Sequence, residues 1–377
     1  MNKSKSKKKI LVLTTNRSDY GLFRNLIQGI NKIKKLDLKL VVAGSHLLKN
    51  YGHTINEIKR DKIPIFKTIS SNYADDSKTA ISQFNLDMAK KFNEVLSKNY
   101  FDIVLVLGDR SEILFCSALS LIYNYKLAHF HGGETTKGVI DNQVRNAISQ
   151  LSDFHFVSHK DYKKKLIKMG INKKKVFLVG GLGASSINSI KLLSKKTIQK
   201  KLKLNLSKKY LIITYHPVTL KKYDIKKEFD NLMHCLDNYK DVIKIITAPN
   251  IDNNNVKIMN IIQNFIKTKK NFHFFKSLGS LNYFSLLKHS SGVVGNSSSG
   301  ILEAPSFKIP TINIGSRQAG RVGSKSIINC NSTKQSITKA LNKILNNQKF
   351  KTSLQKVANP YYQVNTEKKI IKQLLEI

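Results

Sequence analysis

Short apolar runs rich in β-branched residues alternate with longer amphipathic stretches along this chain, and this alternation limits its fold more than any other feature. Such a pattern is typical of a parallel sheet whose two faces are covered by helices. In the first half it predicts strands at Ile10–Thr15, Leu38–Ala43, Ile63–Ile69, Ile103–Leu107, Leu127–Phe130, Phe154–Val157 and Val176–Val179. In the second half it predicts strands at Leu211–Tyr215, Val242–Thr247, Phe272–Phe275, Val293–Val294, Thr311–Ile314 and Ser326–Asn329.

A lysine-dense segment from Lys191 to Lys209 interrupts the alternation. Because 377 residues exceed the usual size of one hydrophobic core, the chain is predicted to be an α/β protein of two doubly wound, Rossmann-like domains. The predicted domains are residues 10–190 and 205–355. Residues 1–9 are predicted to be a basic tail, and residues 356–377 a helix that packs back on the N-terminal domain. Ligands of doubly wound sheets bind beyond the carboxyl ends of the strands, so two such domains facing each other would make one cleft.

The formal net charge of +41 raises nucleic acid or an anionic membrane as a partner. The lysines, however, are spread along the whole chain without aromatic interleaving, and we expect neither partner. Three separated cysteines, Cys116, Cys235 and Cys330, form no CxxC pair, which argues against a zinc site or a disulfide framework. The polar segment Met1–Lys9 has no apolar core after it, so it is neither a signal peptide nor a membrane anchor. We therefore expect a cytoplasmic protein whose basic field attracts anionic substrates.

Arginine is rare in this lysine-rich chain, and five of the seven arginines fall in short turn-like motifs. Arginine holds a phosphate or carboxylate through two parallel hydrogen bonds, which lysine does not. These five residues are therefore candidates for binding an anionic ligand: Arg17, Arg110, Arg145, Arg317 and Arg321.

Two predicted strand ends in the first half carry polar motifs. After the first strand, Arg17 and Ser18 are placed to present donors to a phosphate at a helix N-terminus. A plainer interpretation is that Ser18 or Asp19 caps the helix. After the fourth strand, Asp109 precedes Arg110; a carboxylate there lies against a low-dielectric wall and is a candidate base, although it would also serve as a helix cap.

The densest group of acids and bases follows the fifth strand. Strand alternation puts His129 and His131 on the same side, and Glu134, Asp141 and Arg145 follow closely. Two histidines and two carboxylates make a metal site conceivable, but no HExxH-type spacing completes it, so no metal is predicted.

In the second half, His216 follows the first strand and precedes a proline, which keeps it extended. The Gly/Ser loop Gly295–Gly300 contains Asn296, Ser297 and Ser298 and opens a helix that bears Glu303, an arrangement suited to a phosphate. Arg317 and Arg321 come shortly after. Neither GxGxxG nor GxxxxGK[ST] occurs, so a dinucleotide fingerprint and a P-loop are excluded.

Taken in order, the motifs NRSDYG, GDRSE, HFHGGET, DNQVRNAISQLSDFHF, HPVT, GNSSSGILE and GSRQAGR resemble the hydrolysing UDP-N-acetylglucosamine 2-epimerase family. The resemblance extends from about Lys9 to Ile377. It implies a glycosyltransferase B type fold with a sugar nucleotide in the interdomain cleft, no redox cofactor, and a homodimer or dimer of dimers.

By this resemblance, residues of both halves would bind the nucleotide and its phosphates, and a second set would be catalytic. The nucleotide set is Arg17, Ser297, Ser298, Glu303 and Arg321. The catalytic set is Asp109, Asp141 and His216, and Arg317 falls at the family's functional arginine. The implied reaction removes the C2 proton while the nucleoside diphosphate leaves C1, and water then adds to the 2-acetamidoglycal.

The chain departs from the family at two positions. His131 stands where part of the family has a catalytic glutamate, and Asn142 where many relatives carry an aspartate. The C2 base is therefore open between His131 and Glu134. A non-hydrolysing epimerase and a glycosyltransferase of the same fold remain alternatives, and the sequence leaves open UDP or GDP and N-acetylglucosamine or a 2,4-diacetamido-6-deoxy sugar.

Overall fold

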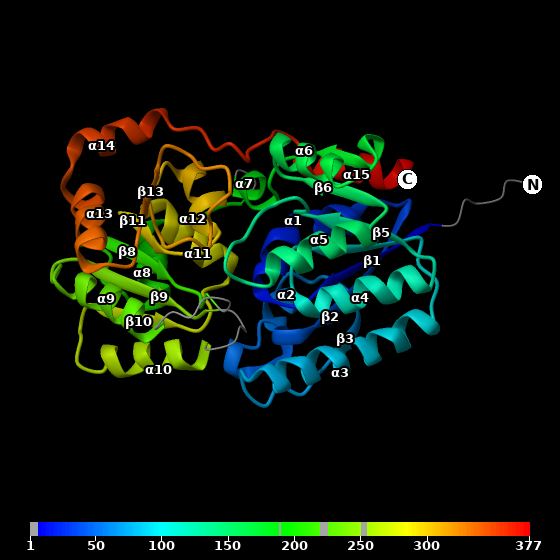
Figure 1. The fold of residues 1–377 in the computed structure, drawn as a ribbon, viewed down its shortest axis with the longest axis horizontal. Coiled ribbons are helices and arrows are strands. Elements are labelled where there is room, and N and C mark those ends of the chain that lie inside the picture. Colours follow the sequence, from blue (N-terminus) through cyan, green and yellow to red (C-terminus); the bar gives the residue numbers. More distant parts are fainter. Residues whose placement is uncertain (1–6, 188–189, 219–224, 250–254) are drawn as a thin grey trace, which may run out of the picture. The chain divides into compact units, whose positions relative to one another are not determined.

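A computed structural model describes residues 7–187, 190–218, 225–249 and 255–377. The chain divides into two compact units, each built on a parallel sheet with helices on both faces (Figure 1). Unit 1 comprises Met1–Glu134, Asp141–Ser186 and Tyr361–Ile377. Unit 2 comprises Thr135–Ile140 and Ile187–Pro360.

The sheet of unit 1 has seven parallel strands in the order β3-β2-β1-β4-β5-β6-β7. All seven predicted strands are confirmed, with ends that shift by at most two residues. Their bounds are β1 (Lys8–Thr14), β2 (Leu36–Ala43), β3 (Ile65–Ile69), β4 (Ile103–Leu107), β5 (Lys126–Phe130), β6 (Phe154–Val157) and β7 (Val176–Leu178). The strand order reverses between β1 and β4, which is where doubly wound sheets bind their ligands.

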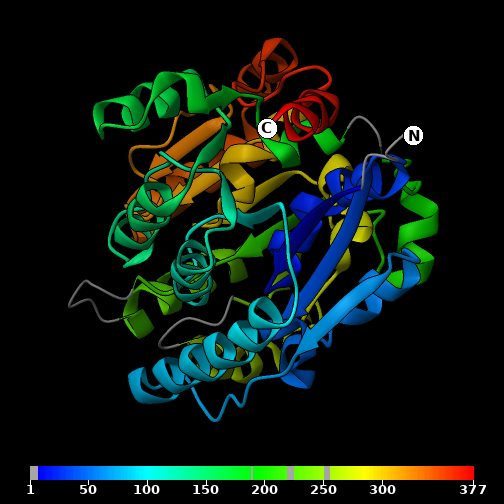
Figure 2. The same cartoon turned by 90° about the vertical axis from the view of Figure 1, so that its right-hand side faces the viewer.

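Alternate residues of these strands enter two different cores, so each face of the sheet needs its own helices. Val12 of β1 faces one core and Leu11 the other. One face is covered by α1 (Arg17–Lys32), α2 (Ile55–Arg60), α7 (Leu182–Ser186) and α15 (Thr366–Glu376). The other is covered by α3 (Lys78–Ser97), α4 (Ser111–Ile122) and α5 (Asp141–Leu151). Figure 2 shows the blue strands of this sheet with α3 and α4 in light blue and cyan beside them.

Unit 1 has four further helical elements among the described residues. They are α6 (Lys160–Lys168), η1 (Gly44–Leu47), η2 (Lys49–Tyr51) and η3 (Lys173–Lys175).

The last helix, α15, belongs to unit 1 (Figure 1). Its Ile370 and Leu374 are fully buried in the same core as α1. Thr366 at its start donates to the carbonyl of Val179 at 2.6 Å. The predicted C-terminal helix is thus shorter than expected, because the chain up to Pro360 belongs to unit 2.

The sheet of unit 2 has six parallel strands in the order β10-β9-β8-β11-β12-β13, and all six predicted strands are confirmed. The strands are β8 (Tyr210–Thr214), β9 (Ile243–Thr247), β10 (Phe272–Phe275), β11 (Gly292–Gly295), β12 (Thr311–Ile314) and β13 (Ile327–Cys330). The helices are α8 (Lys195–Leu202), α9 (Ile225–Asp237), α10 (Asn255–Ile266), α11 (Gly279–His289), α12 (Ser299–Leu302), α13 (Lys334–Asn346) and α14 (Gln348–Ser353), with η5 (Ala304–Phe307) and η6 (Leu354–Lys356). Here the reversal lies between β8 and β11.

The units differ from the predicted ranges in further places. Lys8 and Lys9 are not tail residues, because they pair with Leu36 and Asp37 of β2; the first six residues lie outside the described part of the chain. Unit 1 ends at Ser186, before the predicted limit at 190. The segment 135–140 was predicted to lie in the N-terminal domain, but it belongs to unit 2.

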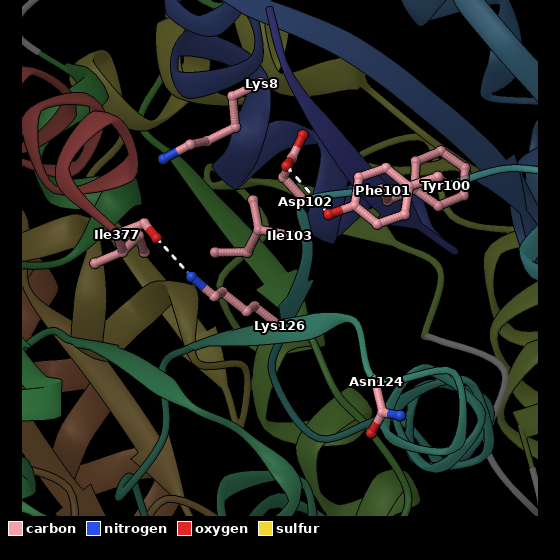
Figure 3. Close-up of a pocket in the computed structure, with 8 residues that line it drawn as sticks. All are labelled: Lys8, Tyr100, Phe101, Asp102, Ile103, Asn124, Lys126 and Ile377. Atoms are coloured by element: carbon pink, nitrogen blue, oxygen red, sulfur yellow. Dashed lines mark hydrogen bonds between the residues drawn. The ribbon is translucent and has the colours of Figure 1, made fainter. Parts of the chain in front are cut away.

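A cavity of about 130 Å³ lies at the amino ends of β1, β4 and β5 (Figure 3). Lys8, Asp102 and Lys126 line it, and Lys126 donates to the carbonyl of Ile377 at 2.8 Å. The residues of this half that were predicted to be catalytic follow the carboxyl ends of the strands. The cavity therefore lies at the opposite end of the sheet from them. None of the described helices combines the length and apolar character needed to cross a bilayer.

Gly44 and Gly170 provide a matched test of the packing that holds the end of β1. Both have a left-handed backbone, with φ of +61° and +89°, but a Cβ on Gly44 would lie 2.6 Å from the Thr15 carbonyl oxygen, whereas one on Gly170 meets no atom within 4 Å. Gly170→Ala should lower the free energy of unfolding by about 1–2 kcal/mol, because the left-handed backbone is unfavourable for alanine. Gly44→Ala should cost clearly more, because the loop after β1 must move. Thermal denaturation followed by circular dichroism compares the two, and equal losses would contradict this account.

Candidate functional site

The predicted residues of the first half gather at the carboxyl ends of β1, β4 and β5, beside the reversal in strand order. Arg17 follows β1, Asp109 follows β4, and His131 follows β5. Glu134 comes three residues after His131, and Arg145 lies one turn into α5.

Arg145 links two of the predicted catalytic carboxylates. Its guanidinium is 2% exposed, and Nη1 donates to Oε2 of Glu134 at 3.2 Å while Nη2 donates to Oδ2 of Asp109. Nη1 also donates to the carbonyl of His131 at 3.4 Å. Sequence reasoning assigned Arg145 to the nucleotide. The geometry favours a different role, because a buried cation paired with two carboxylates holds both of them in fixed positions.

His131 and Glu134 form a close pair. Nδ1 of His131 lies 2.7 Å from Oε1 of Glu134, and the hydroxyl of Ser158 donates to the same oxygen at 2.8 Å. Nζ of Lys165 on α6 donates to the Glu134 carbonyl at 3.3 Å. Burial lowers the pKa of Lys165, as does the charge of Arg145, while Glu134 raises it. Ser158 directly follows β6, and Lys165 lies in α6. Neither was predicted, because neither belongs to a recognisable motif.

His129 has different partners from His131. The alternation that would put both on one side ends at Phe130, because His131 has a left-handed backbone with φ of +63°. His129 is fully buried, and burial lowers its pKa to about 3, so its ring is neutral. Its Nε2 lies 2.7 Å from the carbonyl of Gly108, which only accepts, so Nε2 carries the proton. His129 thereby holds the residue that precedes Asp109.

Both helix caps predicted as plain alternatives are wrong. Asn16, rather than Ser18 or Asp19, caps α1, and its Oδ1 accepts from the backbone N–H groups of Ser18 at 2.8 Å and Asp19 at 3.1 Å. The cap position of α4 is Arg110, without a side-chain capping bond, so Asp109 is not used as a cap. Its carboxylate pairs with Arg145 instead.

Asp19 ties down the loop that carries Arg17. Its Oδ2 accepts from the hydroxyl of Thr15 at 2.9 Å and from Nδ2 of Asn16 at 2.9 Å. Burial raises the pKa of Asp19 to about 6, although Arg110 acts in the opposite direction. A charged Asp19 therefore costs folding free energy in this structure.

In unit 2, the reversal between β8 and β11 is bridged by Asn296. Its Oδ1 accepts from the backbone N–H of His216 at 2.7 Å, and its Nδ2 donates to the His216 carbonyl at 2.8 Å. Asn296 is 1% exposed. Predicted as a nucleotide ligand, Asn296 instead has both ends of its amide engaged by the backbone of a predicted catalytic residue.

The arginine loop of unit 2 packs against the segment 135–140. Arg317 and Gln318 both donate to the carbonyl of Asn296, at 3.3 and 2.8 Å. The carbonyl of Arg317 accepts from the N–H of Lys137 at 3.0 Å, and Nε of Arg321 donates to the carbonyl of Thr135 at 3.3 Å. These bonds explain why 135–140 belongs to unit 2. Gln318 is buried and was not predicted, because glutamine in a loop carries no signal.

The Gly/Ser loop leads into α12, with Ser298 at its cap position. Ser297 and Ser298 are partly exposed, whereas Glu303 at the end of α12 is buried. Among the described residues, no group of three histidine, cysteine or acidic side chains is arranged to hold a metal ion.

Comparison with known proteins identifies the family and the fold. Residues 28–375 match the UDP-N-acetylglucosamine 2-epimerase family. The chain belongs to this family. The epimerase fold is seen again in a crystal structure of UDP-GlcNAc 2-epimerase from Neisseria meningitidis bound to UDP-GlcNAc, with a TM-score of 0.82 and 19% identity over 98% of this chain and 100% of that one. Each unit of this epimerase family member is thus one Rossmann-like half of a glycosyltransferase B type fold.

Two curated relatives of this epimerase are similar over nearly their whole length. One is the "GDP/UDP-N,N'-diacetylbacillosamine 2-epimerase (hydrolyzing)" of Campylobacter jejuni, 39% identical over 86% of this chain and 84% of the relative. The other is the "Polysialic acid biosynthesis protein P7" of Escherichia coli, 35% identical over 95% of this chain and 91% of the relative.

The raised pKa of Asp19 predicts how the stability of this epimerase depends on pH. The folded protein binds the proton more tightly than the unfolded chain, whose aspartate titrates near 3.8, so stability falls as pH rises from about 4 to 6. A shift of this size corresponds to at most about 3 kcal/mol. Asp19→Asn removes this term while keeping the shape. Melting temperatures at pH 4.5 and 7 should therefore show a smaller decline for the variant, and parallel declines would contradict the prediction.

Proposed function

We propose that this protein is a hydrolysing 2-epimerase, which converts a UDP- or GDP-linked N-acetylglucosamine-type sugar to the free N-acetylmannosamine-type sugar and a nucleoside diphosphate. The observation that carries this proposal is the cluster of Asp109, His131 and Glu134 around Arg145. Removal of the weakly acidic C2 proton needs a base in a water-poor setting, which this cluster provides. A relative at 39% identity is named as a hydrolysing enzyme, which favours this reaction over non-hydrolysing epimerisation.

The reaction takes place in two steps. In the first, the C2–H bond breaks and a base takes the proton. The C–H electron pair forms the C1=C2 bond, and the C1–O bond breaks with its pair leaving on the diphosphate. In the second, water adds its hydroxyl to C1 of the 2-acetamidoglycal, and C2 receives a proton on the opposite face. Asp109, Asp141 and His216 are proposed as the acid–base groups that complete these proton transfers.

Arginines and hydroxyl groups are proposed to bind the nucleoside diphosphate. A departing diphosphate gains negative charge, which guanidinium groups stabilise through paired hydrogen bonds. The residues assigned to this role are Arg17, Ser18, Arg110, Ser297, Ser298, Arg317 and Arg321, with Glu303 accepting from the ribose hydroxyls. Asn296 and Arg145 are reassigned as positioning residues, because their polar groups bond to His216 and to two carboxylates.

The sugar is proposed to be a 2,4-diacetamido-6-deoxy hexose, and the product a precursor of nonulosonic acids of the sialic or legionaminic type. Support comes from the Campylobacter jejuni relative, whose name states diacetylbacillosamine. The Escherichia coli relative, named for polysialic acid, keeps N-acetylglucosamine as the competing outcome. No metal or redox cofactor is needed for the proposed steps.

Proton NMR in D2O with UDP-N-acetylglucosamine, its GDP analogue and the 2,4-diacetamido-6-deoxy nucleotide sugar tests this function. The expected result is a free manno-configured sugar carrying deuterium at C2, together with nucleoside diphosphate. An equilibrium mixture of two nucleotide sugars would mean a non-hydrolysing epimerase. Diphosphate release only after an acceptor is added would mean a glycosyltransferase.

Asp109→Asn is the matching variant. It keeps the hydrogen-bonding shape beside Arg145 but removes the carboxylate, so kcat should fall by about 10²-fold or more, the usual size of a general acid–base contribution. The melting temperature and circular dichroism spectrum serve as the folding control. Diphosphate release at the parent rate from a folded variant would remove Asp109 from the mechanism.

A homo-oligomer in the cytoplasm is also proposed. Exposed apolar side chains on α3 and α4, namely Leu86, Phe115, Leu121 and Ile122, support a surface that a second copy covers. Ile122 is 73% exposed. Light scattering should therefore give at least twice the monomer mass, and Ile122→Asp should lower it. A monomeric parent protein at micromolar concentration would contradict the proposal.

A further inference from the structure

Both carboxylate oxygens of Glu134 are engaged by side chains of unit 1. Oε1 lies 2.7 Å from Nδ1 of His131 and accepts from the hydroxyl of Ser158 at 2.8 Å, and Oε2 accepts from Arg145 at 3.2 Å. The Glu134 side chain is 1% exposed. A carboxylate held by three donors and closed off from solvent is suited to orient its neighbours, not to take a proton from a sugar.

The contact with Glu134 also assigns the tautomer of His131. An ionised carboxylate only accepts hydrogen bonds, so Nδ1 of the ring carries the hydrogen. In the neutral ring the lone pair is then on Nε2. This nitrogen is buried and has no hydrogen-bond partner among the described residues, although buried polar atoms nearly always have one. His131 therefore presents an available acceptor on the side of its ring away from Glu134.

The backbone keeps the ring in this orientation. The N–H of His131 donates to the carbonyl of Phe156 at 3.1 Å, and its own carbonyl accepts from Arg145. A Cβ on the following Gly132 would lie 2.9 Å from the hydroxyl of Ser149, so the turn has little room to move. The left-handed φ of +63° costs a non-glycine residue about 1–2 kcal/mol. Such strain persists where the surroundings enforce it, and it is often found at functional sites.

We propose that Nε2 of His131 is the base that removes the C2 proton, and that Glu134, Ser158 and Arg145 are positioning residues that hold the ring with its hydrogen on Nδ1. The proposal rests on the hydrolytic 2-epimerase function proposed above. The proton moves from C2 to Nε2, the C–H electron pair forms the C1=C2 bond, and the diphosphate leaves with the C1–O pair. The imidazolium that results keeps its Nδ1–H on the Glu134 carboxylate, which stabilises the positive charge.

The roles of His131 and Glu134 are separated by comparing two amide variants. His131→Gln should lower kcat by about 10³-fold, because the base is lost. Glu134→Gln should lower kcat by only about 10- to 100-fold with little change in KM, and should increase the isotope effect of a substrate deuterated at C2, because proton removal slows. The reverse ranking, with Glu134→Gln the more damaging in a folded protein, would overturn the proposal.

Serine variants provide the matched control. Ser158→Ala removes one donor to Glu134 and should lower kcat by less than about 10-fold, with an isotope effect that rises as it does for Glu134→Gln. Ser120 is an equally buried serine whose hydroxyl donates to the Cys116 carbonyl at 2.9 Å, and Ser120→Ala should leave both quantities unchanged. If kcat and the isotope effect are the same in Ser158→Ala and Ser120→Ala, Ser158 is not a positioning residue.

The tautomer itself is measured by NMR of protein labelled with ¹⁵N in histidine, with the His131 signals assigned by their loss in His131→Gln. The expected result is a neutral ring protonated on Nδ1 in the parent protein and a shift toward Nε2–H in Glu134→Ala. A neutral His131 protonated on Nε2 in the parent would overturn the proposal. This readout needs no substrate: absence of turnover with all three nucleotide sugars would refute the proposed function, whereas the wrong tautomer would refute the role of His131.

Discussion

The arrangement of the proposed catalytic side chains of unit 1 depends on the ion pairs of the buried Arg145 guanidinium. The side chain of Arg145 is 2% exposed. Burying a charged group raises the free energy of the folded state strongly unless the group is paired and hydrogen-bonded. Arg145 meets this requirement with Glu134 and Asp109, which come from the loops after two neighbouring strands. The cation and the two carboxylates therefore hold one another in place. Ion pairs of Arg145 on α5 connect the loop after β4 with the loop after β5.

Unit 2 joins its central strand ends through a neutral side chain. At its reversal in strand order, the amide of Asn296 bonds to both the N–H and the carbonyl of His216, and so ties the ends of β8 and β11 together. Arg317 and Gln318 then donate to the carbonyl of Asn296. A neutral amide suits position 296 because its oxygen accepts from a backbone N–H group while its nitrogen donates to a backbone carbonyl. In each unit, one buried side chain thus connects the segments after two neighbouring strands.

The fold followed from the sequence because its signals are local. Runs such as Ile103–Leu107 are continuously apolar and separated by polar segments, and all thirteen predicted strands are present. The site was predicted only in outline, because its details depend on contacts between residues far apart in the chain. The hydroxyl of Ser158, for example, donates to the carboxylate of Glu134, 24 residues earlier in the chain. The place of 135–140 in unit 2 depends on Arg321, 186 residues away from Thr135.

The electrostatic environment explains why a histidine suits position 131 in this chain. Asp109 and Glu134 already provide two carboxylates that pair with the guanidinium of Arg145. A third carboxylate at position 131 would add a negative charge beside Glu134, where like charges a few ångströms apart resist being ionised together. A neutral imidazole adds no charge, and it becomes positive only when it takes a proton, next to the carboxylate that holds it. The carboxylate of Glu134 would thus disfavour an ionised glutamate at position 131, whereas it accepts a hydrogen bond from a histidine there.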